Sequence, residues 1–177
     1  TAPHIKTGGT LNNAGLGKDV LAANTTGSTN TALGASALKA NTTASYNTAV
    51  GANALLVNTT GASNTACGLN ALAANTTASN NTAVGAAALD ATTTGANNTA
   101  VGQAALGANT TNSYNTAVGY EALNALNGGQ YQTAFGYQAG KALTTASSST
   151  AIGSKAMLVA TTASQCTAVG EGSMIAL

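Results

Sequence analysis

The stretch NTAVGANALLVNTT, residues 47–60, decides the fold because its pattern returns throughout the chain. Glycine recurs every seventeen residues without an insertion or a deletion. A fixed period of this length is typical of repeat architectures, in which each repeat forms one structural unit. The glycines that mark the repeats are Gly17, Gly34, Gly51, Gly68, Gly85, Gly102, Gly119, Gly136, Gly153 and Gly170.

The neighbours of each glycine recur with it. An apolar residue such as Val50 precedes the glycine in every repeat, and alanine precedes that residue everywhere except at Gly15. Threonine comes next from Thr31 onward, and leucine lies four places after most of the glycines. The consensus is Asn-Thr-Ala-Val-Gly-x-x-Ala-Leu-x-x-Asn-Thr-Thr-x-x-x. We call each set of equivalent positions a row.

The strict period and the residue types predict an all-β fold. Seventeen is not a multiple of the heptad, and threonine, asparagine and glycine are poor helix formers. A stack of coils tolerates insertions poorly, because one slip misplaces every row. We therefore predict a single-stranded parallel β-solenoid of ten 17-residue coils over residues 13–177, after an N-terminal lead-in of residues 1–12. At a strand spacing of ~4.8 Å the rod is about 48 Å long.

Alternation along each Thr-Ala-Val stretch assigns the faces of the strand. Threonine and valine share one side, and alanine takes the other. We expect the valine and leucine rows to fill the interior and the alanine row to meet another subunit at the axis of a symmetric homo-oligomer. The alternative is that only alanine fits a tight interior corner. The predicted interface residues are Ala49, Ala66, Ala83, Ala100, Ala117 and Ala134.

The polar rows are predicted to hold the coils together. Asn30 and its equivalents, with the Asn-Thr-Thr turns, are expected to form ladders of side-chain hydrogen bonds between coils. The recurring glycine is expected to supply a backbone conformation that an L-residue resists.

Composition excludes several kinds of function. Charged residues make up 5% of the chain and the net charge is +1, so no basic stripe is available for nucleic acid. No apolar run reaches the ~18 residues of a membrane span, so we expect no membrane insertion. The single histidine, His4, and the scattered acids form no catalytic cluster. We expect no enzyme activity, no cofactor and no metal site.

The two cysteines lie about six coils apart, so they cannot form a disulfide within one rod. Cys67 occupies the valine row, and we expect it to be a small buried hydrophobic residue. Cys166 lies in the row of Asn30.

Aromatic residues are unevenly distributed. Tyr114, Tyr120, Tyr131, Phe135 and Tyr137 are five of the six aromatic residues of the chain, and they fall in consecutive repeats. Tyr114 and Tyr131 share one row, as do Tyr120 and Tyr137, so each pair is expected to stack on adjacent coils. The four tyrosines are candidate receptor-binding residues that could hold a sugar ring or a protein partner. The alternative is that they fill a widened coil or a subunit contact.

Residues 47–55, with Asn-Thr-Thr at 58–60, resemble repeats of phage tail-fibre and virion-fibre proteins. Residues 149–156 look like head repeats of trimeric autotransporter adhesins of the YadA type. The resemblance covers residues 13–176 and implies a homotrimer of left-handed β-rolls, intertwined or side by side. The period of seventeen is longer than that of the adhesin heads, so their turn geometry and ligand surfaces are not transferred to this chain.

These observations predict a structural and attachment module. The expected role is a rigid trimeric segment of a phage tail or virion fibre, at the virion surface or otherwise extracellular. Its expected partners are a host cell-surface receptor, glycan or protein, and other fibre or virion proteins. Two alternatives remain open. One is the head of a bacterial trimeric surface adhesin, and the other is an ice-binding solenoid with flat threonine rows. Adjacent threonines such as Thr42 and Thr43 weigh against ice binding, because only one of each pair can face outward.

Overall fold

The computed structural model describes residues 4–7 and 11–174, with side chains from residue 11 onward. The described chain is all β, and its eleven strands form one sheet in chain order. The strands are β1 (His4–Thr7), β2 (Ala14–Gly17), β3 (Thr31–Leu33), β4 (Thr48–Val50), β5 (Thr65–Cys67), β6 (Thr82–Val84), β7 (Thr99–Val101), β8 (Thr116–Val118), β9 (Thr133–Phe135), β10 (Thr150–Ile152) and β11 (Thr167–Val169).

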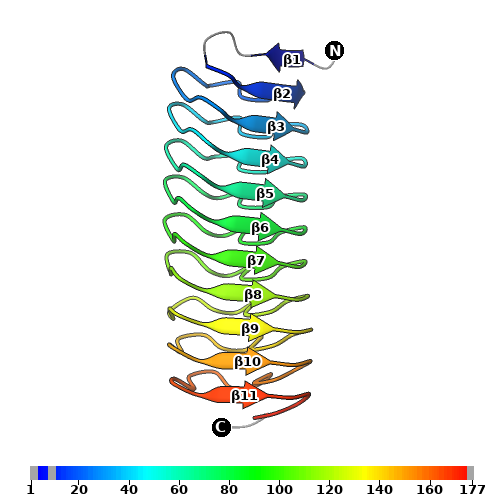
Figure 1. Ribbon diagram of the computed structural model, residues 1–177, viewed down its shortest axis with the longest axis vertical. Coiled ribbons are helices and arrows are strands. Elements are labelled where there is room, and N and C mark those ends of the chain that lie inside the picture. Colours follow the sequence, from blue (N-terminus) through cyan, green and yellow to red (C-terminus); the bar gives the residue numbers. More distant parts are fainter. Residues whose placement is uncertain (1–3, 8–10, 175–177) are drawn as a thin grey trace.

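The molecule is a straight rod in which each coil contributes one short strand to the front face and returns through turns behind it (Figure 1). From β2 to β11 every strand pairs in parallel with its neighbour, and each residue lies opposite its equivalent seventeen places on, as Thr48 does opposite Thr65. The predicted β-solenoid and its repeat register are therefore confirmed. The lead-in contributes β1, which pairs antiparallel with β2. Among the described residues there is no helix, and so none that could span a membrane.

The glycine row has the predicted backbone conformation, and it also lies at a close approach between coils. Gly85 has φ of +136°, a conformation that side-chain-bearing residues rarely adopt. A Cβ atom at Gly85 would lie 2.5 Å from the carbonyl oxygen of Gly102 in the next coil. Only a residue without a side chain fits at this position, which explains why the glycine never varies.

The leucine row begins the return path in a left-handed conformation. Leu55 and Leu89 both have φ of +51° and are fully buried. This conformation costs an L-residue about 1–2 kcal/mol, whereas burying a leucine side chain contributes roughly 1.5–3 kcal/mol. Burial therefore offsets the strain of the turn, and the turn places each leucine inside the rod.

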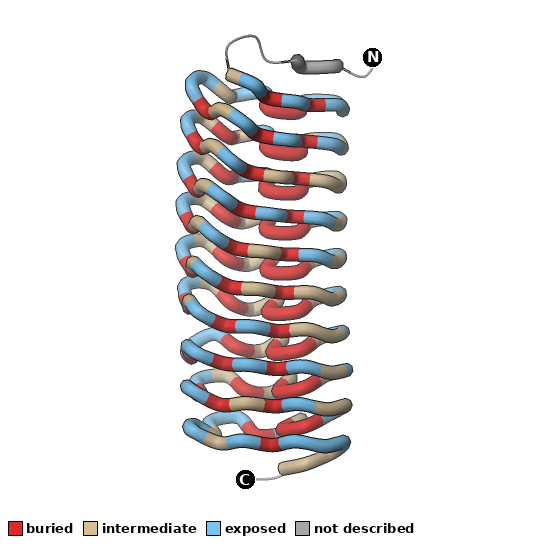
Figure 2. The backbone as a smooth tube through the Cα atoms, in the orientation of Figure 1, coloured by how far each residue is buried: buried red, intermediate tan, exposed pale blue. Residues whose placement is uncertain are grey.

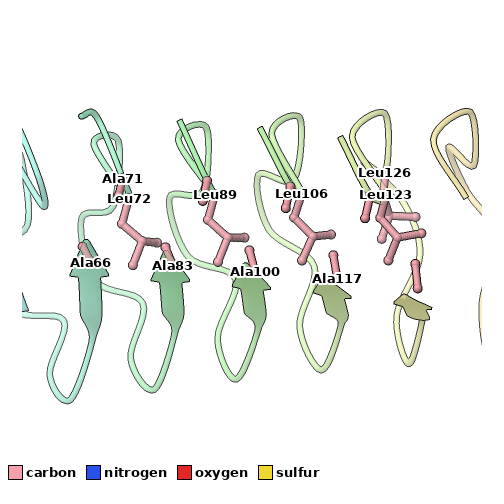
Figure 3. Close-up of a cluster of buried hydrophobic side chains, with 14 of the residues drawn as sticks. Ala66, Ala71, Leu72, Ala83, Leu89, Ala100, Leu106, Ala117, Leu123 and Leu126 are labelled. Carbon is pink, nitrogen blue, oxygen red and sulfur yellow. The ribbon is translucent and has the colours of Figure 1, made fainter. Parts of the chain in front are cut away.

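The interior consists of leucine from the return path packed against alanine from the strands. Figure 3 shows Leu72, Leu89 and Leu106 pointing at the strand alanines of the same stack. Gly140 interrupts the leucine row. A Cβ atom built at Gly140 would lie 3.0 Å from Cδ1 of Leu143. Leu143 thereby fills the space that the missing leucine leaves.

The strand alanines correct one prediction about the faces. Ala49, Ala66, Ala83, Ala100, Ala117 and Ala134 are fully buried within the single chain. Each is the buried central residue of its strand, and Figure 2 shows short buried segments between exposed ones along the front face of the rod. A residue enclosed by its own chain cannot contact another subunit, so the prediction that this row lines an oligomer axis is wrong. The alternative of a tight interior corner is correct, because the facing leucines leave room for a methyl group.

The prediction that the apolar row beside the glycines fills the interior is wrong. Its members share the outer side of the strand with threonine and are half-buried or exposed, and Phe135 is 58% exposed. Cys67 belongs to this row and is exposed, so the expected burial of this thiol is wrong too. The outer apolar row comprises Leu16, Leu33, Val50, Cys67, Val84, Val101, Val118, Phe135, Ile152 and Val169.

Buried asparagines form the predicted ladders between coils. The Asn47 backbone N–H donates to Oδ1 of Asn30 at 2.9 Å, and the Asn47 side-chain amide donates to the Gly61 carbonyl at 2.9 Å. A second row repeats the pattern, since the Asn58 amide donates to Asn41 Oδ1 at 3.0 Å. These bonds satisfy polar groups that burial would otherwise leave unpaired, at a cost of about 1–3 kcal/mol each.

Candidate binding surface

The two tyrosine pairs stack on adjacent coils as predicted. The ring centroids of Tyr114 and Tyr131 are 5.4 Å apart with 9° between the ring planes. Those of Tyr120 and Tyr137 are 5.5 Å apart at 11°. The repeat alone places equivalent residues one strand spacing apart, so the rings meet face to face. All four side chains are exposed.

The pairs lie at opposite ends of β8 and β9. Tyr114 and Tyr131 come two residues before these strands, and Tyr120 and Tyr137 come two residues after them. The outward residues between the pairs are threonine and the outer apolar row, including exposed Phe135. The aromatic residues therefore gather over two neighbouring coils of one rod.

A charged cluster adjoins the second tyrosine pair. The Lys141 ammonium lies 2.6 Å from Oε2 of Glu121, and the Gln138 amide donates to the same oxygen at 2.9 Å. The bond from Lys141, followed by that from Gln138, holds the pKa of Glu121 below its ordinary value. The pKa of Lys141 is raised, first by its bond to Glu121 and with smaller contributions from Tyr120 and Tyr137. The tyrosines therefore lie within electrostatic reach of the ion pair.

Sequence reasoning missed this cluster, although the chain carries a signal for it. Glu121 and Lys141 are twenty residues apart, which is one coil plus three places. Asp19 and Lys39 have the same spacing and lie 3.7 Å apart near the other end of the rod. In both pairs the acid lies two residues after the glycine of its own coil, and the lysine lies five residues after the glycine of the next coil. Side chains at these two positions therefore meet. The 17-residue period shows which residues are equivalent, but it does not show how the turn brings positions that are not equivalent into contact. The pairing could therefore not be predicted from the period alone.

Two further surface features lie away from the aromatic residues, one on the strand face and one on the return path. The outer apolar row is accompanied by a threonine row that extends from Thr31 to Thr167 in continuous register. On the return path, a shallow apolar hollow spans the first three coils and is lined by Ala22, Ala23, Lys39, Ala40, Leu56 and Val57.

Within residues 11–174, no group of three histidine, cysteine, aspartate or glutamate residues lies close enough to hold a metal ion. Asp90 is the one described acid whose pKa is raised, by partial burial, and it lies on a different coil from the Glu121 cluster. Searches of protein-family models, curated proteins and solved structures found no match to this chain.

Proposed function

We propose that the chain is a structural and attachment module, a rigid rod that assembles as a homotrimer within a phage tail or virion fibre. The observation that carries this proposal is the outer apolar row, a line of exposed or half-buried apolar side chains that runs along the outer face of the sheet beside the threonine row. Nine steps of ~4.8 Å give this row a length of about 43 Å. An exposed apolar patch of several hundred Å² normally marks an interaction site.

A second copy of the chain is the partner that best fits this face. The row is straight and continuous, so an identical rod presents a matching row over the same length. Closed association around an axis buries each row once and leaves no apolar face open. The resemblance to fibre and adhesin repeats supports a trimer. The interface of this proposal is the outer apolar row, because the strand alanines are enclosed.

Light scattering of the purified chain tests this assembly, with about three chains expected per particle. Val84→Lys/Val101→Lys places two charges in the proposed interface and should yield a monomer that keeps its β-sheet circular dichroism. Thr94→Lys, in an exposed turn row, is the matched control and should remain trimeric. A monomeric wild-type chain would contradict the proposal.

Cys67 offers a second test, because it lies within the outer apolar row. Mild oxidation should crosslink copies through Cys67 if the rows face one another, and Cys67→Ser should abolish the crosslinked band. Cys166→Ser is the control and should leave that band intact. Crosslinks that depend on Cys166 alone would place the interface elsewhere.

The aromatic cluster supports the attachment part of the proposal. A chain with few charges and few aromatics places five of its six rings in or beside β8 and β9, and all five are exposed, whereas the sixth, Tyr46, lies on another coil. We assign Tyr114, Tyr120, Tyr131 and Tyr137 to contact with a host receptor. The rod then acts at the virion surface, beside other fibre proteins. The head of a bacterial surface adhesin would use the same features.

Ice binding is a second candidate because the strand face carries nine threonines in register, from Thr31 to Thr167. The turn threonines contribute little to it, since the Thr59 hydroxyl donates to the Thr76 carbonyl at 3.0 Å within the rod. Exposed Phe135 and the tyrosines also interrupt the flat plane. Thermal hysteresis from a monomeric chain would favour ice binding over the fibre.

A further inference from the structure

The two tyrosine pairs differ in their surroundings although their stacking is alike. Tyr114 and Tyr131 are flanked along the chain by uncharged residues only. Tyr120 and Tyr137 are followed directly by Glu121 and Gln138, and the Gln138 amide and the Lys141 ammonium both bond to Glu121. We call Tyr120, Tyr137, Glu121, Gln138 and Lys141 the tyrosine–charge cluster. No other part of residues 11–174 combines stacked rings with an ion pair and an amide.

We propose that the tyrosine–charge cluster is a saccharide-binding subsite that takes a pyranose ring. The inference rests on the proposed function, since it names the chemical class of the receptor. A pyranose has apolar C–H faces and a rim of hydroxyl groups, so a site for it needs an open aromatic face with hydrogen-bonding groups beside it. The cluster supplies both from two adjacent coils.

The open aromatic face belongs to Tyr137. Each ring covers one face of its partner, so only the outer faces of the pair remain free. In this row the neighbour of Tyr120 is Gln103, and the neighbour of Tyr137 is the much smaller Ser154. The exposed fractions agree, at 40% for Tyr120 and 48% for Tyr137. A sugar ring therefore fits over Ser154 against the free face of Tyr137.

The polar groups are held in place before any ligand arrives. Lys141 and Gln138 both donate to Oε2 of Glu121, so the carboxylate and its two donors are fixed relative to one another. Fixed groups lose little conformational entropy when a ligand binds. A sugar hydroxyl accepts as well as donates, so a ring over Ser154 can accept from Lys141 or Gln138, which lie on the coil of Tyr137, whereas Glu121 lies one coil further away and positions these donors. Protein receptors more commonly require a larger apolar surface than one ring face.

Binding to an array of oligosaccharides tests the inference, with neutral hexose, N-acetylhexosamine and uronate-bearing chains as probes. Calorimetric titration then gives the affinity for the bound chains. Tyr120→Ala/Tyr137→Ala should weaken binding roughly ten-fold or more, because it removes the stacking surface. Tyr120→Phe/Tyr137→Phe keeps the rings and should retain most of the affinity.

Tyr46→Ala is the control, since it removes an exposed tyrosine whose neighbours in its row are Thr29 and Ser63 and whose neighbours along the chain are uncharged. It should leave the affinity unchanged. Circular dichroism and light scattering of every variant establish that the fold and assembly are intact. Equal losses in the Tyr46→Ala and Tyr120→Ala/Tyr137→Ala variants would overturn the inference, as would the absence of binding to any saccharide.

Adhesion of the rod to bacterial cells separates this inference from the proposed function. Periodate destroys sugars with vicinal hydroxyls, so pretreated cells should lose adhesion that depends on glycans. Undiminished adhesion after periodate, lost in Tyr120→Ala/Tyr137→Ala, would indicate a protein receptor: attachment would stand and the saccharide assignment would fall. A chain that neither trimerises nor adheres to any cell would contradict the proposed function itself.

Discussion

The coils of β4 to β6 and those of β8 and β9 have the same backbone and different surfaces. Strand register, the glycine row and the buried alanines are identical in both regions. In the row of Tyr120 and Tyr137, the coils of β4 to β6 carry Ala52, Leu69 and Ala86, so this row is aliphatic in the first region and aromatic in the second. The inner rows therefore determine the shape of the rod, whereas the outer rows can vary to provide recognition.

The largest expected effect tests whether the backbone is as equivalent as it looks. Gly85→Ala and Gly136→Ala should each destabilise the chain by about 3 kcal/mol or more. Both glycines have strongly positive φ, and a Cβ atom at either would lie 2.5 Å from the carbonyl oxygen of the next coil. Chemical denaturation measures the loss, which should be equal in the two regions.

Gly170→Ala separates conformational strain from steric clash. Gly170 also has positive φ, but no atom lies within 4 Å of the position of its Cβ. The expected loss is only about 1 kcal/mol. A loss at Gly170 as large as that at Gly85 would show that strain, not close approach between coils, fixes this row.

The buried asparagine ladder gives the next effect. In the regular region the Asn64 amide donates to the Ala78 carbonyl at 2.8 Å, and its Oδ1 accepts from the Asn81 backbone at 2.9 Å. Asn64→Ala leaves the Asn81 backbone N–H buried and unpaired, whereas the Ala78 carbonyl keeps its bond from the Asn75 amide at 3.1 Å. The substitution should therefore cost about 1–3 kcal/mol in the free energy of unfolding. Asn64→Ser keeps part of the bonding and should cost less, as the natural Ser149 in this row suggests.

The same row predicts a stabilising change in the aromatic region. Gln132 replaces asparagine there; its Oε1 accepts from the Ser149 backbone at 3.1 Å, but its Nε2 is buried without a partner. Gln132→Asn should restore the amide bond to the carbonyl fourteen residues on and stabilise the chain by about 1 kcal/mol. A decrease in melting temperature would show that the coil is adapted to the longer side chain.

The smallest effect concerns the ion pair. The pKa of Glu121 is lowered in the folded chain, so the carboxylate stabilises the fold above its ordinary pKa. That contribution disappears as the pH falls through the lowered value. Melting temperatures of the wild-type chain and of Glu121→Gln should therefore differ slightly at neutral pH and converge in acid. A difference that persists in acid would assign the effect to packing.

The sequence predicted everything that follows from equivalent residues lying one above another. Strand register, the glycine conformation, the asparagine ladders and the stacked tyrosines are of this kind. The period does not indicate which side of a strand faces inward, so the predicted positions of the valine row and the alanine row are the reverse of those in the structure. Room in the interior decides that question, because Leu72 and its equivalents fill the space that valine would need. The bond between Glu121 and Lys141 depends on the path of the turn and was missed for that reason.

The antiparallel pairing of β1 with β2 gives the rod a defined beginning, whereas every later coil repeats the one before it. A duplication or deletion of one 17-residue coil in the regular part of the rod preserves the strand register and the contacts within the inner rows, and it changes the length by one strand spacing, ~4.8 Å. The length of such a rod can therefore change during evolution in equal steps of one coil, without changes to the sequence of the remaining coils.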